Sequence, residues 1–113
     1  MAQLPESNDF ISEIRGAIES ELSGGDVRLE SIAGVLGRSG RTLQRRLAEE
    51  NCTFAGLVDE VRLEAAKIMM LNQRLSLTDV AYLLGFDEQS SFSRAFKRWT
   101  GQNPRDYRRS VGG

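Results

Sequence analysis

Apolar residues recur every three or four positions along almost the whole chain, and short breaks rich in glycine, serine and asparagine separate the runs. No segment alternates apolar and polar residues for long enough to predict a strand. The pattern therefore predicts an all-α fold of about seven helices. The first begins near Phe10 and ends at Gly24-Gly25. A long central helix is expected over residues 53–72, and its apolar side is formed by Leu57, Val61, Ala65, Ile68 and Met69.

Residues that favour helix ends mark several of the boundaries. Ser39 can cap a helix that runs to about Asn51, and residues 76–79 resemble a capping box. Asp87 is expected to cap the helix that follows. Pro104 stands at the first position of a last short helix, where its fixed backbone angle is favourable.

An internal repeat is the most informative feature of the pattern. One set of five residues matches a second set at a constant offset of 48. The two sets are Leu29, Ile32, Ala33, Leu36 and Gly37, and Leu77, Val80, Ala81, Leu84 and Gly85. After one inserted residue the match continues at an offset of 49. These pairs are Leu43 with Phe92, Arg45 with Arg94, and Leu47 with Phe96.

Each copy of the repeat is a short helix, a turn that contains glycine, and a second helix. This is the plan of a helix-turn-helix unit, in which alanine packs where the helices cross and glycine permits the turn. We predict two such units, at residues 29–51 and 76–100, joined by a linker helix at residues 53–72. Together they belong to a domain of residues 10–113, preceded by a linker or disordered start at residues 1–9.

The formal net charge of −1 hides an uneven distribution of charge. Residues 1–30 contain seven acidic and two basic residues, whereas residues 31–113 contain nine acidic and thirteen basic ones. Two basic clusters stand out. They are Arg38, Arg41, Arg45 and Arg46, and Arg94, Lys97, Arg98, Arg105, Arg108 and Arg109. Because phosphate affinity depends on such local clusters, the overall charge does not argue against nucleic acid as a ligand.

Several classes of function are excluded by composition. The chain has no histidine and a single cysteine, Cys52, so we expect no intrachain disulfide, no metal site and no cofactor. A phosphate-cradling loop and a nucleophile elbow are also missing, so an enzyme is not expected. No apolar run reaches the ~18 residues of a membrane span, and the N-terminus does not resemble a signal peptide. We expect a cytoplasmic protein.

These features also allow other interpretations. Residues 37–40 fit the GxxG loop of RNA-binding KH domains, but the strands that such a domain needs are not predicted. Phe86, Phe92, Phe96 and Trp99 could form a base-stacking platform, yet at helical spacing they are expected in the core. Tandem helix-turn-helix units could also bind RNA, or act as an adapter that binds protein.

From Leu29 to Arg109 the sequence resembles the DNA-binding domain of AraC/XylS-type transcription regulators. The matching motifs are SxxxLQRRL at 39–47, RxxxAxxMM at 62–70, VAxxLGF at 80–86, SFSRAFKRWTG at 91–101 and PxxYR at 104–108, where x marks positions that are not matched. Asn51 stands where the family usually has glycine, and asparagine also tolerates a left-handed backbone. Arg28 stands where the second repeat has its cap, Ser76, so the first unit is expected to be less well capped.

The resemblance implies sequence-specific binding to double-stranded DNA and regulation of transcription. In the family the second helix of each unit enters the major groove, and the linker helix sets their separation. Twenty helical residues span ~30 Å, close to the ~34 Å between successive grooves. Many relatives carry a separate effector-binding or dimerisation domain, and activators of the family contact RNA polymerase subunits. We expect these as further parts and partners of the intact regulator.

The outward positions of the two second helices are the candidate DNA contacts. Base edges are expected to be read by Arg41, Gln44, Arg45, Gln89, Ser90, Ser93 and Arg94. Phosphates are expected to be bound by Ser39, Thr42, Arg46, Lys97, Arg98 and Arg105. As alternatives, Arg46 and Arg98 could instead pair with an acid such as Glu49 or Glu50, and Arg108 and Arg109 could be a basic tail.

Overall fold

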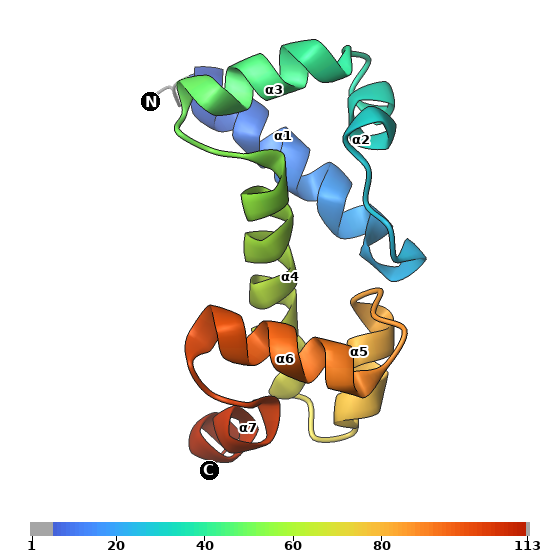
Figure 1. Ribbon diagram of the computed structural model, residues 1–113, viewed down its shortest axis with the longest axis vertical. Coiled ribbons are helices and arrows are strands. Elements are labelled where there is room, and N and C mark those ends of the chain that lie inside the picture. The colour runs from blue at the N-terminus through green and yellow to red at the C-terminus, as the bar shows by residue number, and fades with distance from the viewer. Residues whose placement is uncertain (1–5, 113) are drawn as a thin grey trace, which may run out of the picture. The chain divides into compact units, whose positions relative to one another are not determined.

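The computed structural model describes residues 6–112, which form seven α-helices and one 3-10 turn and contain no strand (Figure 1). The elements are α1 (Glu6–Glu21), η1 (Leu22–Gly24), α2 (Leu29–Val35), α3 (Gly40–Glu49), α4 (Phe54–Met70), α5 (Leu77–Leu83), α6 (Gln89–Thr100) and α7 (Pro104–Gly112). The predicted all-α class is confirmed. The first helix begins at Glu6, ahead of the expected start at Phe10. The predicted linker or disordered segment therefore includes helical residues, and its first five residues lie outside the described part of the chain.

The chain divides into two compact units, and each contains one helix-turn-helix. Unit 1 comprises the chain up to Glu21 together with Asp26–Val61, and unit 2 comprises Leu22–Gly25 and the chain from Arg62 onward. In unit 1, α2 packs against both α1 and α3. In unit 2, α6 packs against α5 and α7, and η1 packs against α5. Among the described residues, none of the helices is long and apolar enough to cross a bilayer.

The repeat seen in the sequence is also a repeat of backbone hydrogen bonds. At the end of α2, the N–H of Arg38 donates to the carbonyl of Ala33 at 2.9 Å. At the end of α5, the N–H of Phe86 donates to the carbonyl of Ala81 at 3.0 Å. Each residue of this second pair follows its counterpart in the first pair by 48 positions. The glycine of each turn has a positive φ, 68° at Gly37 and 90° at Gly85. The two turns therefore begin in the same way, with a left-handed backbone that glycine adopts without strain.

The core of unit 1 forms where α1, α2 and α3 meet. Ile14 and Ile18 of α1, Ile32 of α2, and Leu43 and Leu47 of α3 are almost completely buried. Asn51, just after α3, has the left-handed backbone expected of the residue that replaces the family's glycine, with φ of 57°.

The core of unit 2 contains the aromatic residues that the sequence places at helical spacing. Phe92 and Phe96 are fully buried, with ring centroids 5.7 Å apart. Phe86 lies 5.7 Å from Phe92 and 6.4 Å from Trp99, and the edge of Tyr107 on α7 meets Phe96 at 5.2 Å. These rings pack against one another, so the core interpretation is confirmed over a base-stacking platform.

The buried face of α4 changes side along the helix, and the predicted single stripe is wrong beyond Val61. Leu57 and Val61 are buried in unit 1, whereas Ala66 and Met70 are the buried residues of the half that belongs to unit 2. Five residues separate Val61 from Ala66, a rotation of about 140° around the helix. Ile68 continues the first stripe and is 70% exposed. The helix is also shorter than predicted, 17 residues rather than 20.

Capping follows the sequence at most helix ends. Ser39 accepts from the N–H of Thr42, and Asn103 accepts from the N–H of Asp106 ahead of the helix that Pro104 opens. Arg28 precedes α2 without a capping hydrogen bond, as expected, and its Nε donates instead to the carboxylate of Asp26 at 2.8 Å. The prediction that Asp87 caps α6 is wrong. The turn of unit 2 is one residue longer, so the extended residue before α6 is Glu88, which makes no capping bond.

The Ser76 capping box closes on both sides. Ser76 accepts from the N–H of Asp79 at 3.0 Å, and the Asp79 carboxylate accepts from the N–H of Ser76 at 2.9 Å. Hydrogen bonds from the backbone and side chain of Ser76 hold the pKa of Asp79 below its ordinary value. Because the pKa is lower in the folded protein, the stabilisation is present at neutral pH and is lost as the pH falls through that lowered pKa.

Ser76 caps α5 and Arg28 does not cap α2, so substitutions at these two positions should change the free energy of unfolding in opposite directions. Ser76→Ala should lower the free energy of unfolding of unit 2 by about 1 kcal/mol, because an orphan N–H of α5 loses its acceptor. Arg28→Ser should raise that of unit 1 by a few tenths to about 1 kcal/mol, because α2 gains the same acceptor. Urea denaturation followed by circular dichroism measures both changes. Equal losses in both variants would contradict this description of the caps.

Candidate nucleic-acid interface

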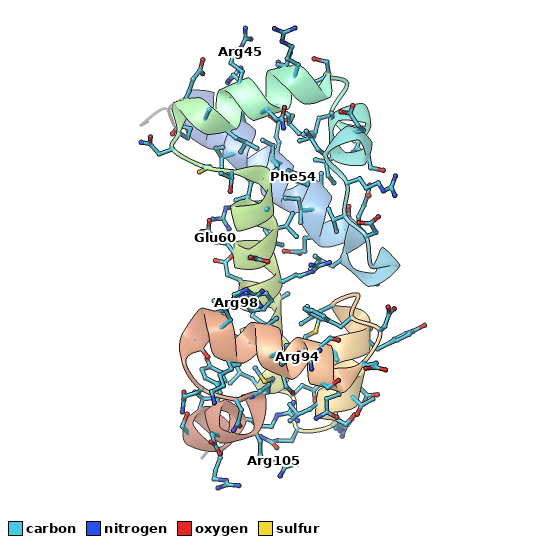
Figure 2. The ribbon with its side chains drawn as sticks, viewed as in Figure 1. Arg45, Phe54, Glu60, Arg94, Arg98 and Arg105 are labelled. Carbon is cyan, nitrogen blue, oxygen red and sulfur yellow. The ribbon has the colours of Figure 1, made fainter. Side chains whose placement is uncertain are left out.

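The outer side of α3 carries the three residues expected to read bases in unit 1. Leu43 and Leu47 are buried, so the opposite side of the helix is directed to solvent. Arg41, Gln44 and Arg45 are all exposed there, and Figure 2 shows Arg45 projecting outward from α3. Gln44 and Arg45 each follow Arg41 by one helical turn, so helical geometry brings both next to Arg41 on this outer side.

The other two arginines of this cluster are held by a residue that the sequence analysis did not connect with them. The guanidinium groups of Arg38 and Arg46 lie 4.9 Å and 4.5 Å from the ring centroid of Phe10, at the start of α1. Arg46 is also 3.9 Å from Glu49, so the alternative of an ion pair is present in the structure. The side chain of Arg46 is 22% exposed. The basic cluster is therefore divided into an outward pair, Arg41 and Arg45, and a pair stacked on Phe10.

The start of α3 is organised by its cap. Ser39 is exposed and is engaged with Thr42 through two hydrogen bonds, one to the backbone N–H and one to the hydroxyl. Thr42 is half-buried. Of the predicted phosphate ligands of unit 1, Ser39, Thr42 and Arg46 thus all have structural contacts within the unit.

On α6 the buried residues Phe92, Ala95 and Phe96 define the inner side. Ser90, Arg94, Lys97 and Arg98 are exposed on the remaining surface. Figure 2 shows Arg94 and Arg98 on this helix. Among residues 10–111, whose side chains the structure describes, Arg98 forms no ion pair, in contrast to Arg46.

Two predicted base-reading residues of α6, Gln89 and Ser93, are half-buried and face a pocket. The pocket has a volume of about 190 Å³ and is lined by Leu77, Gln89, Ser93, Asn103, Pro104 and Arg105. The Gln89 carbonyl accepts from the hydroxyl of Thr78 at 2.7 Å, which leaves the amide N–H₂ as its available donor. Arg105 is exposed at the first turn of α7, on the rim of the same pocket.

Arg108 has a structural contact rather than the role of a free basic tail. It is half-buried, and its Nε donates to the carbonyl of Met70 at 3.1 Å, at the end of α4. Arg62 likewise makes contacts within unit 2. It donates to the carbonyl of Gly25 at 2.7 Å and lies over the Phe86 ring at 5.3 Å. Sequence reasoning singled out Arg62 only as a motif residue.

The two units differ in charge. Unit 1 contains six basic and eleven acidic residues, and unit 2 contains nine basic and five acidic ones. The net positive charge that attracts a polyanion is therefore on unit 2, whereas unit 1 is negatively charged overall and carries Arg41 and Arg45 on the exposed side of α3.

Comparisons with known proteins agree with this arrangement. Residues 32–110 match the model of a helix-turn-helix domain family. The HTH-type transcriptional regulator VqsM of Pseudomonas aeruginosa is 40% identical over 82 residues, 73% of this chain. The chain spans about a quarter of that relative's length.

Solved structures show the same fold. The C-terminal domain of AraT, a response regulator from Geobacillus stearothermophilus, has a TM-score of 0.78 and 32% identity. The comparison covers 96% of this chain and 88% of AraT's. An AraC-type transcriptional regulator structure from Chromobacterium violaceum, 22% identical, has a TM-score of 0.80 over 95% of this chain and 97% of its own. This chain belongs to the AraC-type helix-turn-helix family and is a DNA-binding domain of the kind found in transcription regulators.

Proposed function

We propose that α3 and α6 each enter the major groove of double-stranded DNA, in successive grooves, and read the two half-sites of one operator. The observation that carries this proposal is the structural repeat. In both units the turn begins with the same backbone hydrogen bond and the same left-handed glycine, and the second helix has an equivalent buried inner face. Both units also expose an arginine at the same place, Arg45 and Arg94. A recognition helix reads bases from its outward side, near its N-terminal end.

Within this proposal the exposed residues divide into two roles. Arg41, Arg45 and Arg94 can bond guanine O6 and N7 in bidentate fashion, and Gln44 can bond adenine N6 and N7. Ser90 and Ser93 read either kind of base, and Gln89 contributes the amide donor that its bond to Thr78 leaves available. Phosphate contacts are assigned to Lys97, Arg98 and Arg105, and those of unit 1 to Ser39, Thr42 and Arg46. The positive charge of unit 2 supports a larger share of the sequence-independent attraction for that unit.

A salt titration tests whether duplex DNA is the ligand. If six to eight phosphates are contacted, the logarithm of the association constant should fall against the logarithm of salt concentration with a slope of about −5 to −7. Duplex RNA and single strands of the same length should bind more weakly, because the deep, narrow RNA groove does not admit a helix. A slope near zero, or equal affinity for RNA, would contradict the proposal.

The intact regulator is proposed to be longer than this chain. VqsM and other curated relatives are about four times the length of the region they share with it. We propose an effector-binding or dimerisation domain elsewhere in the regulator, and RNA polymerase subunits as a further partner. The role in transcription would then combine operator binding by this domain with a signal received outside it.

A further inference from the structure

The carboxylate of Glu30 lies against the first residue of α3. Glu30 is the second residue of α2, and α3 begins at Gly40, which is buried. A side chain at position 40 would collide with the carboxylate, since its Cβ would be only 2.9 Å from Glu30 Cδ and closer still to Oε2. The acidic group from α2 thus fills the space that the glycine leaves at the start of the proposed recognition helix.

The second unit has the same contact with different chemistry. By the offsets of the repeat, Glu30 corresponds to Thr78 and Gly40 corresponds to Gln89. Thr78 donates a hydrogen bond to Gln89 at 2.7 Å. In both units, then, the second residue of the leading helix touches the first residue of the recognition helix. In unit 2 the recognition helix supplies a polar side chain there itself, whereas in unit 1 the polar group is the carboxylate of Glu30.

The position and chemistry of this carboxylate suit a contact with a base. The N-terminal residues of a recognition helix are those that meet base edges in a helix-turn-helix complex. Glu30 is exposed, and within residues 6–112 no basic side chain forms an ion pair with it. An ionised carboxylate only accepts hydrogen bonds, so its partner must be a donor. In the major groove that donor is the exocyclic amino group of cytosine or adenine.

We propose that Glu30 is a specificity-determining residue of unit 1 that accepts a hydrogen bond from the amino group of cytosine or adenine. Guanine and thymine present the acceptors O6 and O4, which a carboxylate repels, so they are disfavoured at the same place. The partial positive charge at the N-terminus of the ten-residue helix α3 helps to hold the carboxylate there before DNA binds. This inference rests on the proposed function.

The test compares base preference in the wild-type protein and two variants by fluorescence anisotropy. An operator obtained by selection from random duplexes is substituted one base at a time in the half-site of unit 1. The wild-type protein should prefer cytosine or adenine over guanine and thymine at one position by about tenfold, and the preferred base identifies the donor. Glu30→Thr, which copies unit 2, should reduce this preference to about twofold or less. Glu19→Gln, at an exposed position of α1, removes one negative charge elsewhere in unit 1 and should leave the base preference intact.

Three results would overturn the inference. If Glu30→Thr tightens binding to every duplex equally, the carboxylate only repels phosphate. If Glu30→Thr lowers the melting temperature while base preference is unchanged, Glu30 only stabilises the start of α3 and does not contact a base. Unchanged binding, base preference and melting temperature would leave no role for it. A wild-type protein with no base preference at any position would instead show that the proposed function itself is wrong.

Discussion

Replacing Gly85 with alanine should lower the free energy of unfolding of unit 2 by about 2–5 kcal/mol. Gly85 has a φ of 90°, where an L-residue is strained. An added Cβ would also meet backbone, namely the carbonyl of Leu22 and, at 2.8 Å, the Cα of Gly25. Since neither is the end of a flexible side chain, the strain has to be relieved by moving η1 away from α5.

The first unit provides a matched control for this variant. Gly37 is the repeat equivalent of Gly85 and also has a positive φ, 68°, but its added Cβ would meet nothing within 4 Å. Gly37→Ala should therefore cost only the conformational strain, about 1–2 kcal/mol. Trp99 is the only tryptophan and packs against Phe86, so its fluorescence in urea titrations reports the unfolding of unit 2. Circular dichroism in the same titrations follows the helices of both units. Equal losses in the two variants would mean that the contact with η1 does not constrain the turn.

Replacing Arg45 and Arg94 together should weaken binding to the selected operator by about 2–6 kcal/mol. Each bidentate arginine–guanine contact discriminates by about 1–3 kcal/mol, and residues on different recognition helices are expected to contribute additively. Binding to non-operator duplexes should change much less. The measurement is a set of anisotropy titrations of both single variants and the double variant at one fixed salt concentration.

Lys97→Ala is the control for charge alone. Lys97 is exposed on the same helix as Arg94 and is assigned to phosphate. Its loss should weaken operator and non-operator DNA about equally and reduce the salt slope by about 1. If the arginine variants behave in this same way, Arg45 and Arg94 contact phosphates and do not read bases.

The helix-turn-helix units could be predicted from sequence because their determinants are local. Ala33, Gly37 and Ala81 act through the backbone of their own turns, as does the positive φ of Gly85, and each is visible as a spacing in the chain. Ser39 and the Ser76 capping box are similarly short-range. The contact of Gly85 with Leu22 and Gly25 is long-range and is not visible in this way. Where a turn or a cap depends only on residues within five positions of each other, the sequence pattern is enough to predict it.

Two predictions are wrong because spacing along the chain shows neither that a helix is shared by two units nor how long a turn is. A single apolar stripe along α4 requires one buried face over the whole helix. The helix instead belongs to two units and buries a different side in each, so Ile68 is exposed. The side chain of Asp87 suits a cap, but the longer turn of unit 2 places the start of α6 beyond it.

Contacts between distant residues could not be inferred from spacing. Phe10 precedes Arg38 and Arg46 by 28 and 36 residues, and an apolar residue at a helix start is usually read as core only. Glu30 and Gly40 are closer in sequence, but their contact depends on how α2 and α3 cross. The candidate base-reading residues of α3 were all found exposed, because two buried leucines were enough to orient that helix.

The central claim is that each unit reads its own half-site, and selection from random duplexes by three proteins tests it most directly. The wild-type domain should enrich a motif with two separate blocks of conserved bases. Arg45→Ala should lose conservation in one block only, and Arg94→Ala in the other only, because the two arginines occupy equivalent places on different recognition helices. If both variants lose the same block, or if the wild-type motif has a single block, then one of the two helices does not read DNA and the claim is wrong.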